Sequence, residues 1–262
     1  MINIVVLIGI TVVCLAISVC VWGGYDAIAS IKKKIPPNVP LAEFGPRWSA
    51  SVIDLDKCDP EKAAFRIIED CGYYDQEACF NTQRVYVKGD LKPFINFLKV
   101  YFKKFSKNVP YLVDNIDISA NRSLALIEAT YMENEAIKGD DWAIIIMNDN
   151  CKEQITHPLN RTLVVHQVDD LKEISRSFNK ESQTLSVYPW NIIQDYRDDW
   201  AAYGICRFVE LGWSRIFRSG FTHDGVHGMH PFVRISCIER PWSDSGKYYS
   251  YKTKFRTVLV YR

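Results

Sequence analysis

The stretch Asp75-Gln76-Glu77-Ala78-Cys79-Phe80-Asn81-Thr82-Gln83-Arg84-Val85-Tyr86-Val87 decides how this sequence folds. Its first part is polar and has neither helical nor strand spacing, as is typical of a connection. Its last four residues, Arg84 to Val87, predict a strand. Cys79 therefore lies on a loop that leads into a strand, and functional residues gather on such loops.

Helical patterns flank this stretch on both sides. Pro60 to Cys71 and Leu91 to Phe105 each place their apolar residues at helical spacing, and the second carries an aromatic stripe that we assign to the core. Short apolar runs predict further strands at Ser51 to Leu55, Trp142 to Met147, Thr162 to Val165 and Leu185 to Tyr188. The alternation predicts an α/β fold with a mainly parallel sheet and flanking helices.

The opening run from Ile2 to Trp22 has no charged side chain and is long enough to cross a bilayer. A membrane anchor over residues 2–22 is one interpretation, although no basic residue precedes the run as in a secretory signal. Two buried parallel strands, Ile2 to Ile8 and Ile17 to Trp22, are the other. A turn at Gly23 and Gly24 and a helix from Asp26 to Lys34 would follow the second strand, so we favour the strands.

Composition excludes several classes of function. The 262 residues are 48% hydrophobic, enough for a large core, and their net charge of +1 gives no general attraction to nucleic acid or anionic membranes. The eight cysteines are scattered singly with no CxxC pair, which predicts reduced thiols in a cytoplasmic protein without a structural zinc site.

Cys79 is the candidate nucleophile among these thiols. The other cysteines lie in apolar surroundings, on a helix or in polar loops, where structural thiols are common. A catalytic cysteine needs access, a reactive thiolate and donors for the oxyanion formed on its substrate. The acidic neighbours of Cys79 disfavour a thiolate, so the residues alone leave its role open.

The segment resembles the active-site segment of the aldehyde dehydrogenases, in which a glutamine-containing turn leads through the nucleophilic cysteine into an Arg-x-Tyr-Val strand. Arg84-Val85-Tyr86-Val87 matches that ending. The closer resemblance is to the long-chain acyl-CoA reductases of luminous bacteria, which read Asp-Gln-Gln-x-Cys and continue with a Pro-Gln or Thr-Gln pair. Asp75-Gln76-Glu77-Ala78-Cys79 and Thr82-Gln83 match this pattern.

Two earlier blocks extend the resemblance in the same order. Val21-Trp22-Gly23-Gly24-Tyr25-Asp26-Ala27 resembles the glycine turn that faces the nicotinamide, which implies cofactor binding at Gly23 and Gly24. Glu43-Phe44-Gly45-Pro46-Arg47-Trp48-Ser49 resembles the Glu-Leu-Gly-Gly-Lys-Ser segment. Glu43 precedes Cys79 by 36 positions, close to the spacing of the superfamily's general-base glutamate, although acyl-CoA reductases often lack that residue.

A closing block also resembles these reductases. It comprises Gly204 to Gly212, His223-Asp224-Gly225 and Pro231 to Arg234. His223, His227 and His230 are dense enough to suggest a metal site, but the glycines between them break any helix that would align them. We therefore expect no metal, and instead a role for His223 and Asp224, together with Gln76, in positioning substrate or cofactor.

The resemblance implies an acylating reductase that converts long-chain fatty acyl-CoA to fatty aldehyde with NADPH through an acyl-enzyme on Cys79. Its implied partners are fatty acyl-CoA or an acyl-carrying synthetase or transferase protein, and further copies of itself. A noncatalytic dehydrogenase-like binding or assembly module is the alternative. Loss of cofactor binding would favour that alternative.

The resemblance also implies a domain organisation. Residues 1–43 match a remnant of the dinucleotide-binding domain, 44–203 the catalytic domain and 204–240 a return to the cofactor domain. Residues 241–262 form a tail with the alternation of an edge or oligomerisation strand. The family's front region has no counterpart here, so we expect an incomplete cofactor domain and no useful NADPH binding by these 262 residues alone.

Overall fold

The computed structural model describes residues 18–111, 116–148, 156–227, 232, 234–237 and 257–260. The chain divides into two units, a smaller one of residues 1–45 with 220–262 and a larger one of residues 46–219. The predicted strand Ile2 to Ile8 and most of the hydrophobic run lie outside the described residues. Within the described part, no helix combines the length and apolar character needed to cross a membrane.

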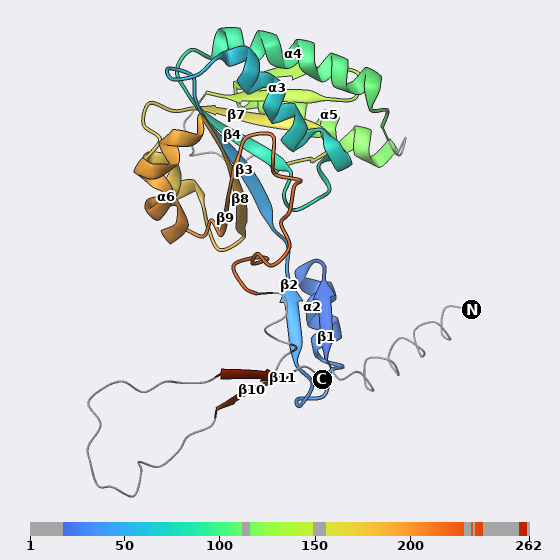
Figure 1. Ribbon diagram of the computed structural model, residues 1–262. Helices are drawn as coiled ribbons and strands as arrows, with labels where there is room; N and C mark the ends of the chain where they lie inside the picture. The colour runs from blue at the N-terminus through green and yellow to red at the C-terminus, as the bar shows by residue number, and fades with distance from the viewer. Residues whose placement is uncertain are drawn as a thin grey trace, which may run out of the picture. The chain divides into compact units, whose positions relative to one another are not determined.

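The larger unit is built on a seven-stranded sheet of order β5-β6-β7-β4-β3-β8-β9 (Figure 1). Its strands, in chain order, are β3 (Trp48–Asp54), β4 (Thr82–Lys88), β5 (Glu135–Lys138), β6 (Ala143–Met147), β7 (Thr162–Gln167), β8 (Ser182–Tyr188) and β9 (Arg207–Glu210). All neighbours pair in parallel except β5 and β6. The predicted mainly parallel sheet is confirmed, and each strand predicted in this unit is present.

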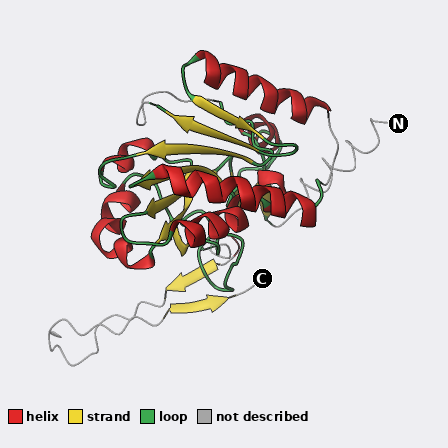
Figure 2. Cartoon of the chain, turned by 90° about the horizontal axis from the view of Figure 1, so that it is seen from above, coloured by secondary structure: helices red, strands yellow, loops and turns green. Residues whose placement is uncertain are grey.

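Helices cover both faces of this sheet (Figure 2). α3 (Pro60–Cys71) and α4 (Leu91–Asn108) pack on one face, against Ile53, Val85 and Val87. The neighbouring strand residues Val52 and Tyr86 point to the other face, because side chains alternate along a strand. There α6 (Ile193–Ala202) packs against β3 and β8, and α5 (Ile116–Tyr131) packs against β6 and β7.

The helices on either side of the Cys79 segment begin at aspartates. Asp59 precedes α3 and accepts the Glu61 N–H at 2.9 Å, and Asp90 precedes α4 and accepts the Lys92 N–H at 3.0 Å. These carboxylates satisfy amides that the first helical turn leaves unpaired. The predicted aromatic stripe of α4 is core, with Phe94, Leu98 and Phe102 completely buried.

The smaller unit holds a parallel βαβ arrangement. β1 (Val19–Trp22) pairs in parallel with β2 (Leu41–Phe44), and α2 (Tyr25–Lys32) connects them after the Gly23, Gly24 turn. In the same unit β10 (Arg234–Cys237) pairs antiparallel with β11 (Thr257–Val260), where the sequence predicts a tail strand. Strand β9 pairs with β8, so residues 207–210 belong to the larger unit, and the predicted segment 204–240 spans both units.

His166 on β7 is a buried ring with no hydrogen-bond partner on either nitrogen. It is 2% exposed and stacks on Tyr86 at 5.1 Å between ring centres. Burial lowers the pKa of His166 to about 3, and the positive charge of Arg84 acts in the same direction. The folded chain therefore holds this imidazole neutral.

We expect His166 to make the fold acid-sensitive. His166 binds a proton near pH 6.5 in the unfolded chain and only near pH 3 in the folded chain. Its neutral form therefore contributes fully to the unfolding free energy above pH 6.5, and this contribution falls as the pH drops toward 3. From pH 7 to pH 5 the parent should lose about 2 kcal/mol more unfolding free energy than His166→Phe. Urea unfolding at both pH values measures this, and equal losses in the two proteins would contradict it.

Candidate active site

Cys79 lies between the short helix η1 (Tyr73–Gln76) and the start of β4. The buried Asn81 side chain stabilises this turn, because it accepts the Ala78 N–H at 3.2 Å and donates to the Asp70 carbonyl at 2.9 Å. The loop that carries Cys79 is thereby attached to the last turn of α3. The predicted position of Cys79, on a loop leading into a strand, is confirmed.

Gln76 stabilises the same loop through hydrogen bonds to β4 and β7. Its side chain is 1% exposed and donates to the carbonyls of Thr82 and Thr162, both at 2.8 Å. Its amide oxygen accepts the Thr162 N–H at 2.7 Å. In this structure Gln76 thus orders the Cys79 segment against β7, and its predicted contact with substrate or cofactor stays a prediction.

A buried ion cluster lies beside Gln76. The Arg161 guanidinium donates to Asp75 at 2.7 Å, to Asp141 at 2.6 Å and to the Val109 carbonyl at 3.0 Å. Arg161 is 1% exposed. Sequence reasoning missed this cluster, because its two charged partners lie 86 and 20 positions away from Arg161 along the chain.

The Cys79 sulfur and carbonyl face the beginnings of β3 and β8. Gln183 on β8 donates its side-chain N–H to Cys79 Sγ at 3.4 Å, and Ser49 on β3 donates to the Cys79 carbonyl at 2.6 Å. Arg207, at the start of β9, lies near enough for its charge to interact with the thiol. Each of these side chains lies at the amino end of its strand, so the site occupies that edge of the parallel sheet.

Aromatic side chains line the adjoining surface. Phe80 packs against Tyr74 at 5.7 Å and against Phe217 at 5.2 Å between ring centres. Tyr74 and Phe217 are exposed, and so are the nearby apolar residues Trp213 and Ile216. The candidate nucleophile therefore lies next to exposed apolar surface rather than in a purely polar surrounding.

The buried Asp70 carboxylate holds the loop that carries Phe217. It accepts the backbone N–H groups of Gly212 at 2.8 Å and Ser214 at 2.9 Å. Burial raises the pKa of Asp70, while these hydrogen bonds act in the opposite direction. The carboxylate connects α3 to the loop after β9.

Two other described thiols of the larger unit, Cys58 and Cys71, are less suited to nucleophilic chemistry. Burial, together with Asp54 and Asp59, raises the pKa of Cys58 to about 12. Burial also raises the pKa of Cys71, which is completely enclosed in the core. Since the thiolate is the reactive form, neither is a good acyl acceptor at neutral pH.

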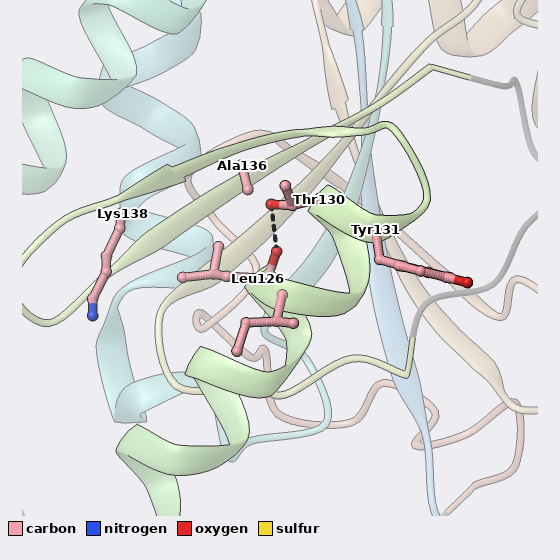
Figure 3. A pocket seen from close by; sticks show the side chains of 6 residues that line it. Leu126, Thr130, Tyr131, Ala136 and Lys138 are labelled. Atoms are coloured by element: carbon pink, nitrogen blue, oxygen red, sulfur yellow. Dashed lines mark hydrogen bonds between the residues drawn. The ribbon is translucent and has the colours of Figure 1, made fainter.

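A separate depression of about 480 Å³ lies between α5 and β5 (Figure 3). Its lining is mostly apolar: Leu126, Ile127, Thr130, Tyr131, Ala136 and Lys138. The Thr130 hydroxyl is satisfied within the helix, by the Leu126 carbonyl at 2.8 Å. No cysteine lines this depression, so we assign the thiol chemistry to the Cys79 loop.

The remaining predicted residues lie in the smaller unit. Glu43 on β2 forms an exposed ion pair with Lys32 at 2.6 Å, and the His223 ring packs on Phe44 at 5.0 Å. Asp224 adjoins His223, with 4.0 Å between carboxylate and imidazole. Because Cys79 belongs to the other unit, a joint action of Glu43 and Cys79 stays a prediction. His230 lies outside the described residues, within which no cluster of potential metal ligands occurs.

Gly23 and Gly24 form the turn between β1 and α2. Gly24 occupies the N-cap of α2, where no side chain caps the helix, and a Cβ added there would meet no atom within 4 Å. An open glycine turn between a parallel strand and an uncapped helix start is suited to approach by a dinucleotide. The residues present fit the predicted cofactor at this place.

The fold is that of the aldehyde dehydrogenases. The chain is similar to an indole-3-acetaldehyde dehydrogenase of P. syringae, with a TM-score of 0.62, 13% identity, and coverage of 79% of this chain and 47% of that one. It is also similar to an NADP-dependent glyceraldehyde-3-phosphate dehydrogenase of Bacillus halodurans, with a TM-score of 0.59, 15% identity, and coverage of 78% and 46%. These distant likenesses show the fold alone.

Within this class, the chain belongs to the acyl-CoA reductase (LuxC) family, whose sequence model matches residues 11–235. It is 39% identical over 231 residues to a long-chain acyl-protein thioester reductase of Aliivibrio fischeri. The matched region covers 87% of this chain and 48% of the relative. The reductase of the same description from Vibrio harveyi is 32% identical, with coverage of 88% and 48%. The resemblance seen in the sequence is confirmed, and the chain spans about half the length of these curated relatives.

Proposed function

We propose that this chain carries the acyl-accepting site of a long-chain fatty acyl thioester reductase, with Cys79 as the nucleophile. The observation that supports this best is the geometry around Cys79, a half-buried thiol on a hydrogen-bonded loop, with an amide donor 3.4 Å from its sulfur. The relatives are described as acyl-protein thioester reductases, which favours a protein-bound acyl donor. Long-chain acyl-CoA presents the same thioester group.

In the first half-reaction the Cys79 thiolate attacks the carbonyl carbon of the donor thioester. A bond forms between Sγ and that carbon, the oxygen takes the negative charge, and the backbone N–H of Cys79 is the donor that we assign to it. The carbon to donor-sulfur bond then breaks, and the donor thiolate leaves and takes a proton from water. Exposed Tyr74 and Phe217 offer apolar surface along which an acyl chain can lie.

The resemblance implies NADPH as cofactor, and when bound it would supply a hydride to the acyl carbon. Gly23 and Gly24 are the residues of this chain that would hold it, because their open turn permits close approach of the backbone. The Cys79 sulfur then leaves as thiolate, and the aldehyde is released. We assign residues 1–43 and the part of 204–240 that follows the larger unit to the cofactor domain, and 44–203 together with β9 to the catalytic domain. We assign the tail to assembly of a homo-oligomer.

Incubation of the chain with a long-chain acyl-CoA, followed by intact mass spectrometry, tests the first half-reaction. We expect one acyl group per chain, released by hydroxylamine as a thioester is. A protein-bound acyl donor should give the same adduct. The absence of an adduct with either donor would contradict the proposal and favour a noncatalytic binding module.

Glu43→Gln tests the proposed participation of Glu43 in thiol activation or thioester hydrolysis. We expect hydrolysis of the acyl-enzyme to slow by about tenfold to a hundredfold and its pH dependence to change, as for loss of a general base. Glu135→Gln on β5 provides a matched exposed control. An unchanged rate and pH profile in Glu43→Gln would remove Glu43 from the site.

A further inference from the structure

Three side chains form a hydrogen-bond relay that ends on the Cys79 sulfur. Arg207 on β9 donates to the Thr184 hydroxyl at 3.4 Å, and Thr184 donates to the Gln183 side-chain oxygen at 3.4 Å. Gln183 then donates to Cys79 Sγ, also at 3.4 Å. The relay runs across two neighbouring strands of the sheet and reaches the thiol from the side of β8.

The relay determines which way the Gln183 amide faces. Arg207 has only donors, so Thr184 must accept from it and has its own hydrogen left for the Gln183 oxygen. The oxygen end of the amide therefore faces Thr184, and the NH₂ end faces the sulfur. Gln183 is 2% exposed, so this orientation is held by the protein and not by bulk water.

Arg207 is itself fixed by three further contacts. It donates to the carbonyls of Ser214 at 2.6 Å and Ile216 at 2.8 Å, and its guanidinium lies over the Phe217 ring at 4.2 Å. Burial lowers the pKa of Arg207, while Asp70 and the thiols of Cys79 and Cys206 act in the opposite direction. A guanidinium remains charged under such conditions, so Arg207 keeps its N–H donor to Thr184 across the pH range of the experiment.

Ser49 connects the relay to the backbone of the same cysteine. Its hydroxyl donates to the Cys79 carbonyl at 2.6 Å and accepts the Thr184 N–H at 3.2 Å. The carbonyl and the sulfur of Cys79 are thus both placed relative to the first residues of β8. The backbone of Cys79 is thereby held beside the first residues of β8, which include Gln183.

We propose that Gln183 is a catalytic residue that stabilises the Cys79 thiolate by an N–H···S hydrogen bond, and that Thr184 and Arg207 act as positioning residues. This inference rests on the proposed function, in which Cys79 accepts the acyl group. The sulfur is anionic twice in that cycle, before it attacks the thioester and when it leaves the reduced carbon. A donor aimed at the sulfur favours both states over the neutral acyl-enzyme.

The titratable groups near the thiol define what a pH experiment will report. Arg207 is the first residue of β9, and Cys206 immediately precedes it. The Cys206 thiol donates to the Gln183 carbonyl at 3.4 Å. Glu77 lies two positions before Cys79 on the same loop and is exposed. None of these groups is changed when the Gln183 side chain alone is replaced.

The test is the pH profile of Cys79 alkylation by iodoacetamide in the full chain, read by mass spectrometry of the Cys79 peptide. In Gln183→Leu the midpoint of the profile should move up by about one pH unit, because a hydrogen bond to the charged form is lost. Thr184→Val, which keeps Gln183, should move it up by a smaller amount. Gln167→Leu on β7, whose side chain bonds to the Gly89 carbonyl, is the matched control and should not move it.

The outcomes separate this inference from the proposed function. A Gln183→Leu profile that superposes on the parent, or an equal shift in Gln167→Leu, would overturn the role of Gln183 even if Cys79 is acylated. A shifted profile in a chain that takes no acyl group would support the hydrogen bond and count against the reductase. If Gln183→Leu does not fold, an unchanged Thr184→Val profile overturns the relay.

Discussion

Replacing Cys79 by serine is expected to lower acyl transfer to the chain by on the order of a thousandfold or more. A serine hydroxyl is a far weaker nucleophile near neutral pH, and the two described side chains of the larger unit that hydrogen-bond to Cys79, Gln183 and Ser49, are not general bases. The Gln183 amide donates to the Cys79 sulfur and the Ser49 hydroxyl donates to the Cys79 carbonyl, so neither accepts a proton from the side chain of residue 79. Mass spectrometry after incubation with a long-chain acyl-CoA measures the loss directly.

Cys58→Ser is the matched control for this experiment. Because burial and two aspartates raise the pKa of Cys58 to about 12, its thiol is protonated at neutral pH and should take no part in acylation. We expect the control to acylate at the parental rate. Hydroxylamine-sensitive labelling that survives in Cys79→Ser would show that another residue is the acceptor.

Local sequence patterns predicted much of the fold. Helices α3 and α4 have apolar residues at helical spacing and an aspartate at each start, so α3 was predicted over its full range and α4 from its first residue. The predicted end of α4, Phe105, falls short of the observed end at Asn108. Strands β6 and β7 are buried on both faces and are therefore continuous apolar runs. Strands β2, β5 and β9 were not predicted, because each is only four residues long and lacks such a run.

The surroundings of Cys79 were less accessible to sequence reasoning. Gln183 is 104 positions from Cys79, and the two meet only because β4 and β8 both pair with β3. An isolated glutamine at the start of a strand has no signature that distinguishes it from a structural residue. The resemblance identified the cysteine, but strand order places its partners, and strand order depends on pairings distant in the sequence.

Arg161→Met is expected to cost about 3–5 kcal/mol of unfolding free energy, as for other buried ion pairs that lose one partner. The guanidinium contacts Asp75 and Asp141 and is 1% exposed, so its removal leaves two carboxylates near a low-dielectric interior without their counter-charge. A drop in Tm of roughly 10 °C or more corresponds to this loss in a chain of this size. Thermal and urea unfolding at neutral pH measure it.

Lys172→Met is the control for loss of a positive charge, because Lys172 pairs with Asp199 at 4.0 Å with both side chains exposed. Such pairs contribute about 0–1 kcal/mol, so this variant should unfold close to the parent. Asp75→Asn added to Arg161→Met should recover part of the loss, since one uncompensated buried charge is then removed. If Arg161→Met unfolds within about 1 kcal/mol of the parent, the cluster does not anchor Asp75. The order of the Cys79 loop would then depend on Gln76 and Asn81 instead.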